Sequence, residues 1–207
     1  MARYVAFLRA VNVAGHARVD MNSVRDLFMR AGCERAETYI QSGNVIFDTT
    51  RDPLVQFPEI RARICKLTGE QSAVVFRSER EIQALVRSSP FKAFESDRAL
   101  KLYAVCLLEK PRTRPTFPCE QPQELLEAIG MKGLDVLVVS RRKPNGFYGF
   151  PNSFVEKALG VPATSRNWST VTRVAALMNA GVNRQPRPAR ADEARRGGSA
   201  GSRSRES

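Results

Sequence analysis

The sequence predicts an α+β protein of two ferredoxin-like halves, each a split βαβ unit, with a disordered basic C-terminal tail. Three observations lead to this prediction. Strand-like and helix-like segments follow the same order in residues 1–94 and 95–180, capping and turn residues bound most of these segments, and Val182 is the only large apolar residue after residue 180. We therefore expect an N-terminal half at 1–94, a C-terminal half at 95–180 and a disordered tail at 181–207.

The first half begins with a strand, a helix and a hairpin. Residues 4–11 are largely apolar on both faces, which is typical of a strand in the middle of a sheet. Asp20 then predicts the start of a helix with one apolar side, and Gly32 predicts its end. Residues 38–40 and 45–47 predict two short strands joined by a tight turn.

The rest of the first half adds a helix, a strand and a second helix. Pro58 predicts the start of a helix that stops near Gly69, and residues 73–76 predict the next strand. Ser78 and Glu81 form a capping box, in which the serine accepts a hydrogen bond from a free backbone N–H and the glutamate reaches back. This half therefore reads β-α-β-β-α-β-α.

The second half repeats this order. A long apolar strand over residues 100–108 precedes a predicted helix that starts at Pro122 and ends at Gly130. Residues 134–139 and 146–149 predict paired strands joined by a turn.

Two predicted helices and a short strand complete the second half. Asn152 or Ser153, with Glu156 in reach, predicts the cap of the first of these helices. A short strand follows near residues 163–164, and Asn167 predicts the cap of the last helix.

Composition argues against several classes of protein. No apolar run is long enough to cross a bilayer, and the first residues lack the features of a secretory signal, so we expect a cytoplasmic protein with no membrane partner. The four cysteines form no C-x-x-C pair, and His16 is the single histidine. We therefore expect no metal site and no disulfide framework. No glycine-rich nucleotide motif is present, and we expect no cofactor.

The net charge of +12 leaves a nucleic-acid partner open. Seven arginines against three acidic residues place +4 of this charge in residues 181–207, which leaves +8 (12 − 4) elsewhere. Only seven of the 33 basic residues are lysines, a skew that we attribute to biased codon composition. Basic stripes with interleaved aromatic residues, which mark an RNA platform, are missing from the sequence.

Three stretches resemble a known family. They are residues 8–15, 38–47 and 164–171, which read LRAVNVAG, TYIQSGNVIF and TSRNWSTV. In order and spacing they are similar to the bacterial domain-of-unknown-function family 1697 (DUF1697), over about residues 1–180. The resemblance implies a two-part ferredoxin-like α+β fold and no particular activity. Ala10 and Ala14 stand where the family tends to glycine, which argues against a phosphate cradle in this loop.

The same stretches place polar side chains at strand ends, turns and a helix start, where scaffolds carry binding groups. The candidate ligand-binding residues are Arg9, Asn12, Gln41, Ser42, Asn44, Arg166, Asn167 and Trp168. Their fixed donors suit anions, carboxylates or amide-like edges. We therefore predict a small anionic or nucleotide-like ligand bound between the two halves.

A purely structural interpretation competes with this site. Asn167 then only caps a helix, Asn44 only forms a turn and Trp168 only fills the core. Arg9 would pair with a structural carboxylate such as Glu37 or Asp48.

Two further classes of function remain as alternatives. One is weak nucleic-acid binding through the basic surface and tail, which would fall steeply with salt. The other is a protein-interaction module, including a homo-oligomer formed through an exposed sheet face or edge.

No catalytic constellation is recognisable, so the sequence leaves open whether the protein is an enzyme. Ser140 and Lys143 match the S-x-x-K pattern, but they leave a strand and meet Pro144, where that chemistry needs a turn of helix. A Cys–His nucleophile pair would have to use His16, and no cysteine lies near it in the sequence.

Overall fold

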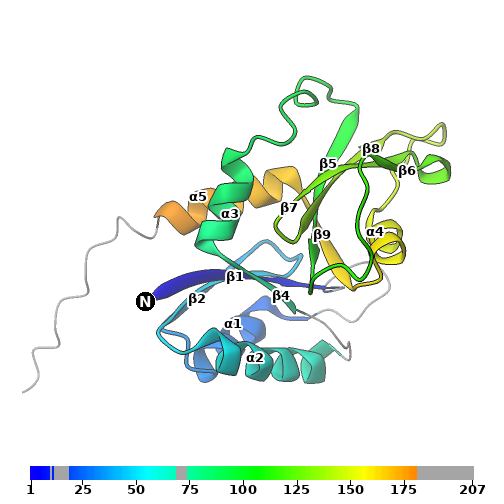
Figure 1. The fold of residues 1–207 in the computed structure, drawn as a ribbon. Coiled ribbons are helices and arrows are strands. Elements are labelled where there is room, and N and C mark those ends of the chain that lie inside the picture. The colour runs from blue at the N-terminus through cyan, green and yellow to red at the C-terminus, as the bar shows by residue number, and fades with distance from the viewer. Residues whose placement is uncertain (10, 12–18, 69–73, 181–207) are drawn as a thin grey trace, which may run out of the picture.

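Two antiparallel sheets and five α-helices make up the described part of the chain, which the computed structural model gives as residues 1–9, 11, 19–68 and 74–180 (Figure 1). The prediction of a mixed α and β protein is confirmed. The predicted tail at 181–207 and the candidate Asn12 lie outside the described residues. None of the helices in these ranges combines the length and apolar character needed to cross a membrane.

The first sheet has the strand order β2-β3-β1-β4. Its strands are β1 (Ala2–Leu8), β2 (Arg35–Tyr39), β3 (Asn44–Thr49) and β4 (Val74–Ser78). β1 lies between two neighbours because it is apolar on both faces, and its last four residues are all buried.

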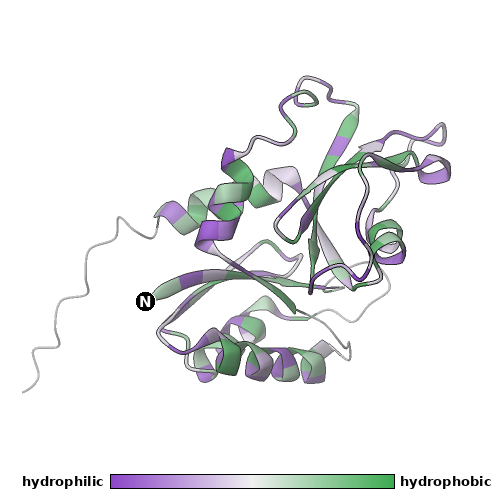
Figure 2. Cartoon of the chain, viewed as in Figure 1, coloured by the Kyte–Doolittle hydropathy of each residue, from purple (hydrophilic) through white to green (hydrophobic). Residues whose placement is uncertain are grey.

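Helices α1 (Met21–Arg30) and α2 (Pro53–Thr68) cover one face of this sheet (Figure 1). Asp20 caps α1 as predicted, because its carboxylate accepts hydrogen bonds from the first backbone N–H groups of the helix. In Figure 2, α2 alternates between hydrophilic and hydrophobic segments along its length, as expected for a helix with one buried side.

The predicted start of α2 at Pro58 is wrong, since the helix begins at Pro53. Asp52 supplies the start, because its side chain accepts a hydrogen bond from the N–H of Leu54 and its carbonyl from that of Gln56. Pro58 therefore lies inside the helix.

The second sheet has the strand order β6-β7-β8-β5-β9. Its strands are β5 (Leu100–Leu107), β6 (Cys119–Gln121), β7 (Leu126–Lys132), β8 (Asp135–Arg141) and β9 (Ala163–Asn167). Helix α4 (Asn152–Leu159) covers one face of it with Phe154, Val155 and Leu159.

The predicted helix from Pro122 to Gly130 is wrong. The segment forms a single 3-10 turn, η1 (Pro122–Glu124), and then strand β7. Leu125 ends the turn in the left-handed region at φ 52°, after which alternate residues of β7 enter the core beside β8. Pairing with a neighbouring strand has overridden the local preference for helix.

The predicted strand at residues 146–149 is also wrong, because only Tyr148 pairs, in an isolated bridge with Arg142. Gly149 instead lies against η1, where an added Cβ would sit 2.4 Å from the carbonyl oxygen of Glu124. β7 takes the place beside β8 that this segment was expected to fill.

Helices α3 (Glu79–Arg87) and α5 (Trp168–Ala180) lie side by side between the two sheets (Figure 1). The capping box predicted at the start of α3 is confirmed. Val174 and Met178 of α5 pack against Val5 and Phe7 of β1, together with Cys106 of β5. The second face of the first sheet is therefore covered by α3, through Ile82, and by α5 from the C-terminal part of the chain, and the two halves share a core.

A buried ion pair joins the halves. The Nε of Arg77, on β4, lies 3.1 Å from Oδ1 of Asp135 at the start of β8, and the residues are 3% and 2% exposed. The Nη2 of Arg77 also donates to the carbonyl oxygens of Leu107 and Leu134, each at 2.9 Å. The charge of Arg77 is thus matched by one carboxylate and by backbone acceptors from the other half.

The burial of the cysteines gives a simple test of this packing. Burial raises the pKa of Cys33 to about 12 and that of Cys106 well above its ordinary value, while Cys65 and Cys119 are half-buried. We expect a thiol reagent at about pH 8 to modify Cys65 and Cys119 in the folded protein, and all four cysteines only after denaturation. Rapid modification of four thiols in native buffer would contradict the core described above.

Candidate functional site

A cavity of about 630 Å³ lies where the two halves meet. The end of β1 and the turn between β2 and β3 line it from the first half. The start of α4 and strand β9 line it from the second. Its volume falls within the range of small-molecule sites, roughly 300–1,000 Å³.

Arg166, on β9, lies at the junction, and protein acceptors engage its whole guanidinium. Nε donates to Oδ1 of Asn44 at 2.5 Å, and Nη1 donates to two acceptors of β9 itself. Nη2 donates to the carbonyl oxygens of Leu8 at 2.7 Å and of Gly43 at 3.0 Å. A guanidinium carries five N–H donors, so none is left over for a ligand.

The contacts of Arg166 connect the three stretches that carry the family resemblance. Leu8 belongs to the first, Gly43 and Asn44 to the second, and Arg166 to the third. Burial lowers the pKa of Arg166 to about 10, so the side chain stays charged at neutral pH. The phenyl ring of Phe7 lies 5.1 Å from the guanidinium carbon and adds a cation–π contact. The geometry gives Arg166 the role of a structural tie between the halves.

The turn between β2 and β3 is shaped to receive this arginine. Gly43 has φ 79°, and an added Cβ would lie 2.8 Å from the Cβ of Leu8, so only glycine fits without distortion. Asn44 is fully buried, and its Nδ2 donates to the carbonyl oxygen of Tyr39 at 2.9 Å and to Oγ of Ser42 at 3.2 Å. Asn44 is therefore also engaged within the protein.

Arg9 lies just beyond β1 and pairs across the cavity region with Glu156 of α4, at 3.2 Å. The expected pairing with Glu37 or Asp48 is wrong, because Asp48 binds Arg3 and Glu37 binds Arg35. The Arg9 side chain is 29% exposed, and so it remains accessible.

Glu156 does not cap α4, which corrects the predicted role. Its Oε1 instead accepts a hydrogen bond from the backbone N–H of Ala163 at 2.7 Å, which links α4 to β9.

α4 begins after Pro151 without a side-chain cap. Asn152 and Ser153, at the start of this helix, both line the cavity. The first N–H groups of a helix lack partners within it, and with the helix dipole they favour an anion.

Two buried polar atoms in the cavity lining lack a hydrogen-bond partner. They are the Oγ of Ser165 and the Oδ1 of Asn152, and Ser165 is only 8% exposed. The Oε1 of Gln56 is the third such side-chain atom in the described ranges. An unsatisfied buried polar group costs about 1–3 kcal/mol. Two of the three therefore gather where a ligand could satisfy them.

The other predicted site residues divide between the cavity and its surroundings. Ser42 and Asn167 line the cavity. Trp168 lies outside the lining and packs edge-on against Phe91, with ring centroids 5.1 Å apart. Gln41 lies exposed in the turn that holds Ser42. The structure thus brings Arg9, Ser42, Arg166 and Asn167 to one cavity, whereas Trp168 is half-buried and packs against the core.

Sequence reasoning missed Ile40, Tyr103, Phe150 and Ser165, which all line the cavity. Tyr103 is buried on β5, and burial raises its pKa, but nothing in the sequence separates it from ordinary core residues. A usable signal existed for Phe150, since this aromatic residue stands beside Pro151 just outside an amphipathic helix.

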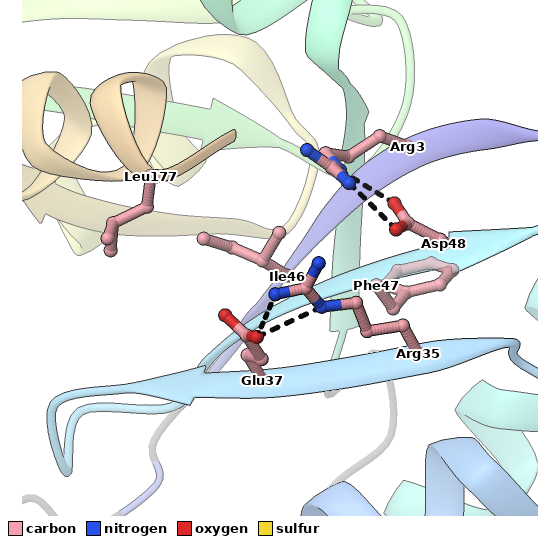
Figure 3. A pocket seen from close by; sticks show the side chains of 7 residues that line it. All are labelled: Arg3, Arg35, Glu37, Ile46, Phe47, Asp48 and Leu177. Carbon is pink, nitrogen blue, oxygen red and sulfur yellow. Dashed lines mark hydrogen bonds and ion pairs between the residues drawn. The ribbon is translucent and has the colours of Figure 1, made fainter. Parts of the chain in front are cut away.

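A second hollow at the far end of the shared core is too small for a ligand. Figure 3 shows Arg3 bound to Asp48 and Arg35 bound to Glu37, with Leu177 of α5 nearby. The free volume is about 10 Å³, close to the minimum that holds one water. The described residues also contain no group of three His, Cys, Asp or Glu side chains that could bind a metal ion.

Comparison with known proteins bears on the first two of the three converging stretches, residues 8–15 and 38–47. Residues 1–136 match the family described as "Protein of unknown function (DUF1697)", which is more than half of the 207 residues. The chain belongs to DUF1697. The expected family is confirmed by residues 1–136, and the third stretch, residues 164–171, lies beyond that match.

One solved structure similar to this DUF1697 chain is that of a conserved bacterial protein from Streptococcus pneumoniae. The two share 18% sequence identity with a TM-score of 0.59, over 86% of this chain and 98% of the other. At this identity the likeness shows the fold alone. No curated protein matches the chain.

Proposed function

We propose that this protein binds a small anionic ligand in the cavity between its halves. The observation that carries the proposal is the pair of unpartnered buried polar atoms, Ser165 Oγ and Asn152 Oδ1, beside the accessible guanidinium of Arg9. A serine hydroxyl can donate to an anion, whereas the amide oxygen accepts from an N–H or O–H elsewhere on the ligand. The ligand therefore combines an anionic group with at least one hydrogen-bond donor.

The charges around the cavity support an anion. Arg9 and Arg166 are positive, and Glu156 is the single acidic residue among the described residues of the lining. The Arg9–Glu156 pair is partly exposed, and such pairs contribute only about 0–1 kcal/mol. A ligand anion can therefore replace Glu156 as the partner of Arg9 at a small cost in free energy. Glu156 keeps the hydrogen bond that it accepts from the backbone N–H of Ala163.

Two substitutions with opposite expected effects on the affinity for an anion test this arrangement. We expect Arg9→Ala to weaken anion binding about tenfold or more, because a charge-assisted hydrogen bond is lost. Glu156→Gln should strengthen binding several-fold, since it frees Arg9 while the amide oxygen can still accept the Ala163 N–H. Isothermal titration of the full chain with inorganic phosphate, citrate and AMP measures both effects.

Arg87→Ala provides the matched control, because Arg87 is an exposed arginine at the end of α3 and outside the cavity lining. It should leave the affinity unchanged. Equal weakening by Arg9→Ala and Arg87→Ala would indicate unspecific attraction to a basic protein and contradict the proposal.

We also infer that both halves follow the split βαβ plan. The first half runs β-α-β-β-α-β with the sheet order β2-β3-β1-β4. In the second half, β7-β8-β5-β9 has the same relative order, with β6 and η1 where the first half has α1. From the sequence, we further propose that the protein lies in the cytoplasm.

A further inference from the structure

We infer that the ligand carries a planar aromatic ring, held between Ile40 of the first half and Phe150 of the second. This inference rests on the proposed function and specifies the class of ligand. Nucleoside monophosphates and aromatic carboxylates share the required chemistry, a flat ring joined to an anionic group. The ring would lie between the two exposed apolar side chains, and the anionic group near Ser165, Arg9 and the start of α4.

Phe150 is the first observation. It is 60% exposed, yet it lines the cavity and meets the buried Tyr103 edge-on, with ring centroids 6.4 Å apart. The Tyr103 ring supports the Phe150 ring in a T-shaped contact, and Phe150 still leaves much of its side chain open to solvent. An exposed aromatic surface fixed by a buried aromatic neighbour is a suitable stacking platform.

Ile40 is the second and independent observation. Its backbone has φ 50°, a left-handed conformation that strains a β-branched residue, and its side chain is 48% exposed. Burial therefore does not explain why an isoleucine stands here rather than glycine or asparagine. The turn around it is fixed, because Asn44 binds the carbonyl oxygen of Tyr39 on one side of Ile40. Strain of this kind gathers at ligand sites.

The two residues come from opposite halves and line the same cavity. The described ranges contain eight exposed large apolar residues, and Ile40 and Phe150 are the two that line it. Ser165 Oγ adds a buried polar atom without a partner in the same lining. The cavity thus offers apolar contacts for a ring and polar contacts for an anion, within a volume of about 630 Å³ that can hold both.

Matched ligands separate the ring from the anion. We expect AMP to bind about tenfold or more tightly than ribose 5-phosphate, and indole-3-acetate more tightly than acetate, when each is titrated into the full chain. A preference in the first pair alone identifies a nucleotide. A preference in the second pair alone identifies an aromatic carboxylate.

Matched variants locate the effect. Phe150→Ala should abolish the preference for ring-bearing ligands, while Phe147→Ala should not, because Phe147 is 72% exposed and lies outside the lining. Ile40→Gly should weaken AMP binding without lowering the midpoint of unfolding, because glycine relieves the strained φ. A loss of AMP affinity in Phe147→Ala equal to that in Phe150→Ala would overturn the inference.

The failure of this inference can be told apart from the failure of the proposed function. Equal binding of AMP and ribose 5-phosphate, both weakened by Arg9→Ala, would overturn the aromatic ring and retain the anion site. Equal binding of AMP and neutral adenosine, both dependent on Phe150 and both unaffected by Arg9→Ala, would retain the ring and overturn the anion site. Binding of none of these probes would overturn both.

Discussion

Replacing Arg166 with alanine is expected to lower the free energy of unfolding by about 4 kcal/mol, the largest effect of any single substitution considered. The change removes the hydrogen bonds that Arg166 donates to the carbonyl oxygens of Leu8 and Gly43 and to Oδ1 of Asn44. The Gly43 carbonyl then keeps only the backbone N–H of Leu8 as a donor. Urea unfolding, followed by circular dichroism, measures the loss. Domains of ordinary stability unfold with about 5–15 kcal/mol, so the loss is a large share of the total.

Arg166→Lys sharpens the test, because lysine keeps the charge but offers three donors on a single atom rather than a planar fork. We expect it to recover less than half of the loss. Arg173→Ala is the control on the exposed side of α5 and should change the free energy of unfolding by less than about 0.5 kcal/mol. If Arg166→Ala behaves like Arg173→Ala, Arg166 does not tie the halves together.

The second large effect concerns the buried pair of Arg77 and Asp135. Asp135→Ala is expected to cost about 3 kcal/mol, because it leaves the guanidinium of Arg77 buried without its carboxylate. In a double-mutant cycle with Arg77→Met, the same change should cost about 2 kcal/mol less, since the charge is then gone. Urea unfolding of the four proteins gives the coupling.

An exposed ion pair provides the control for this cycle. Arg25 and Asp26 lie 2.8 Å apart, but their side chains are 45% and 50% exposed. Asp26→Ala should therefore change the free energy of unfolding by less than about 0.5 kcal/mol. Independent effects of Asp135→Ala and Arg77→Met would contradict a direct contribution of the pair.

Local signals in the sequence predicted those parts of the fold that local interactions decide. Asp20 and the Ser78–Glu81 box marked helix starts because their side chains bond to backbone within three residues. The strand β7 could not be predicted in the same way. Leu125, Leu126 and Ile129 fit a helical spacing, and only the neighbouring strand β8 makes residues 126–132 extended.

The candidate site shows the same division. The sequence identified Arg9, Ser42 and Arg166 as polar groups at element ends, and the structure brings them to one cavity. It could not reveal that carbonyl groups more than a hundred residues away use up the donors of Arg166, since backbone acceptors leave no mark on residue type. Ile40 was missed for a related reason, because its left-handed φ depends on how the turn is closed.

The position of α5 has a consequence for synthesis on the ribosome. Every strand of the first sheet is available once residue 78 has been translated, and Ile82 of α3 follows at once. The apolar side formed by Val5, Phe7 and Val75 is nevertheless covered in full only when Val174 and Met178 of α5 arrive. While the intervening residues, about a hundred, are translated, the nascent chain exposes part of an apolar surface that α5 covers later. We expect ribosome-associated chaperones to bind that apolar surface and to dissociate when α5 emerges from the ribosome.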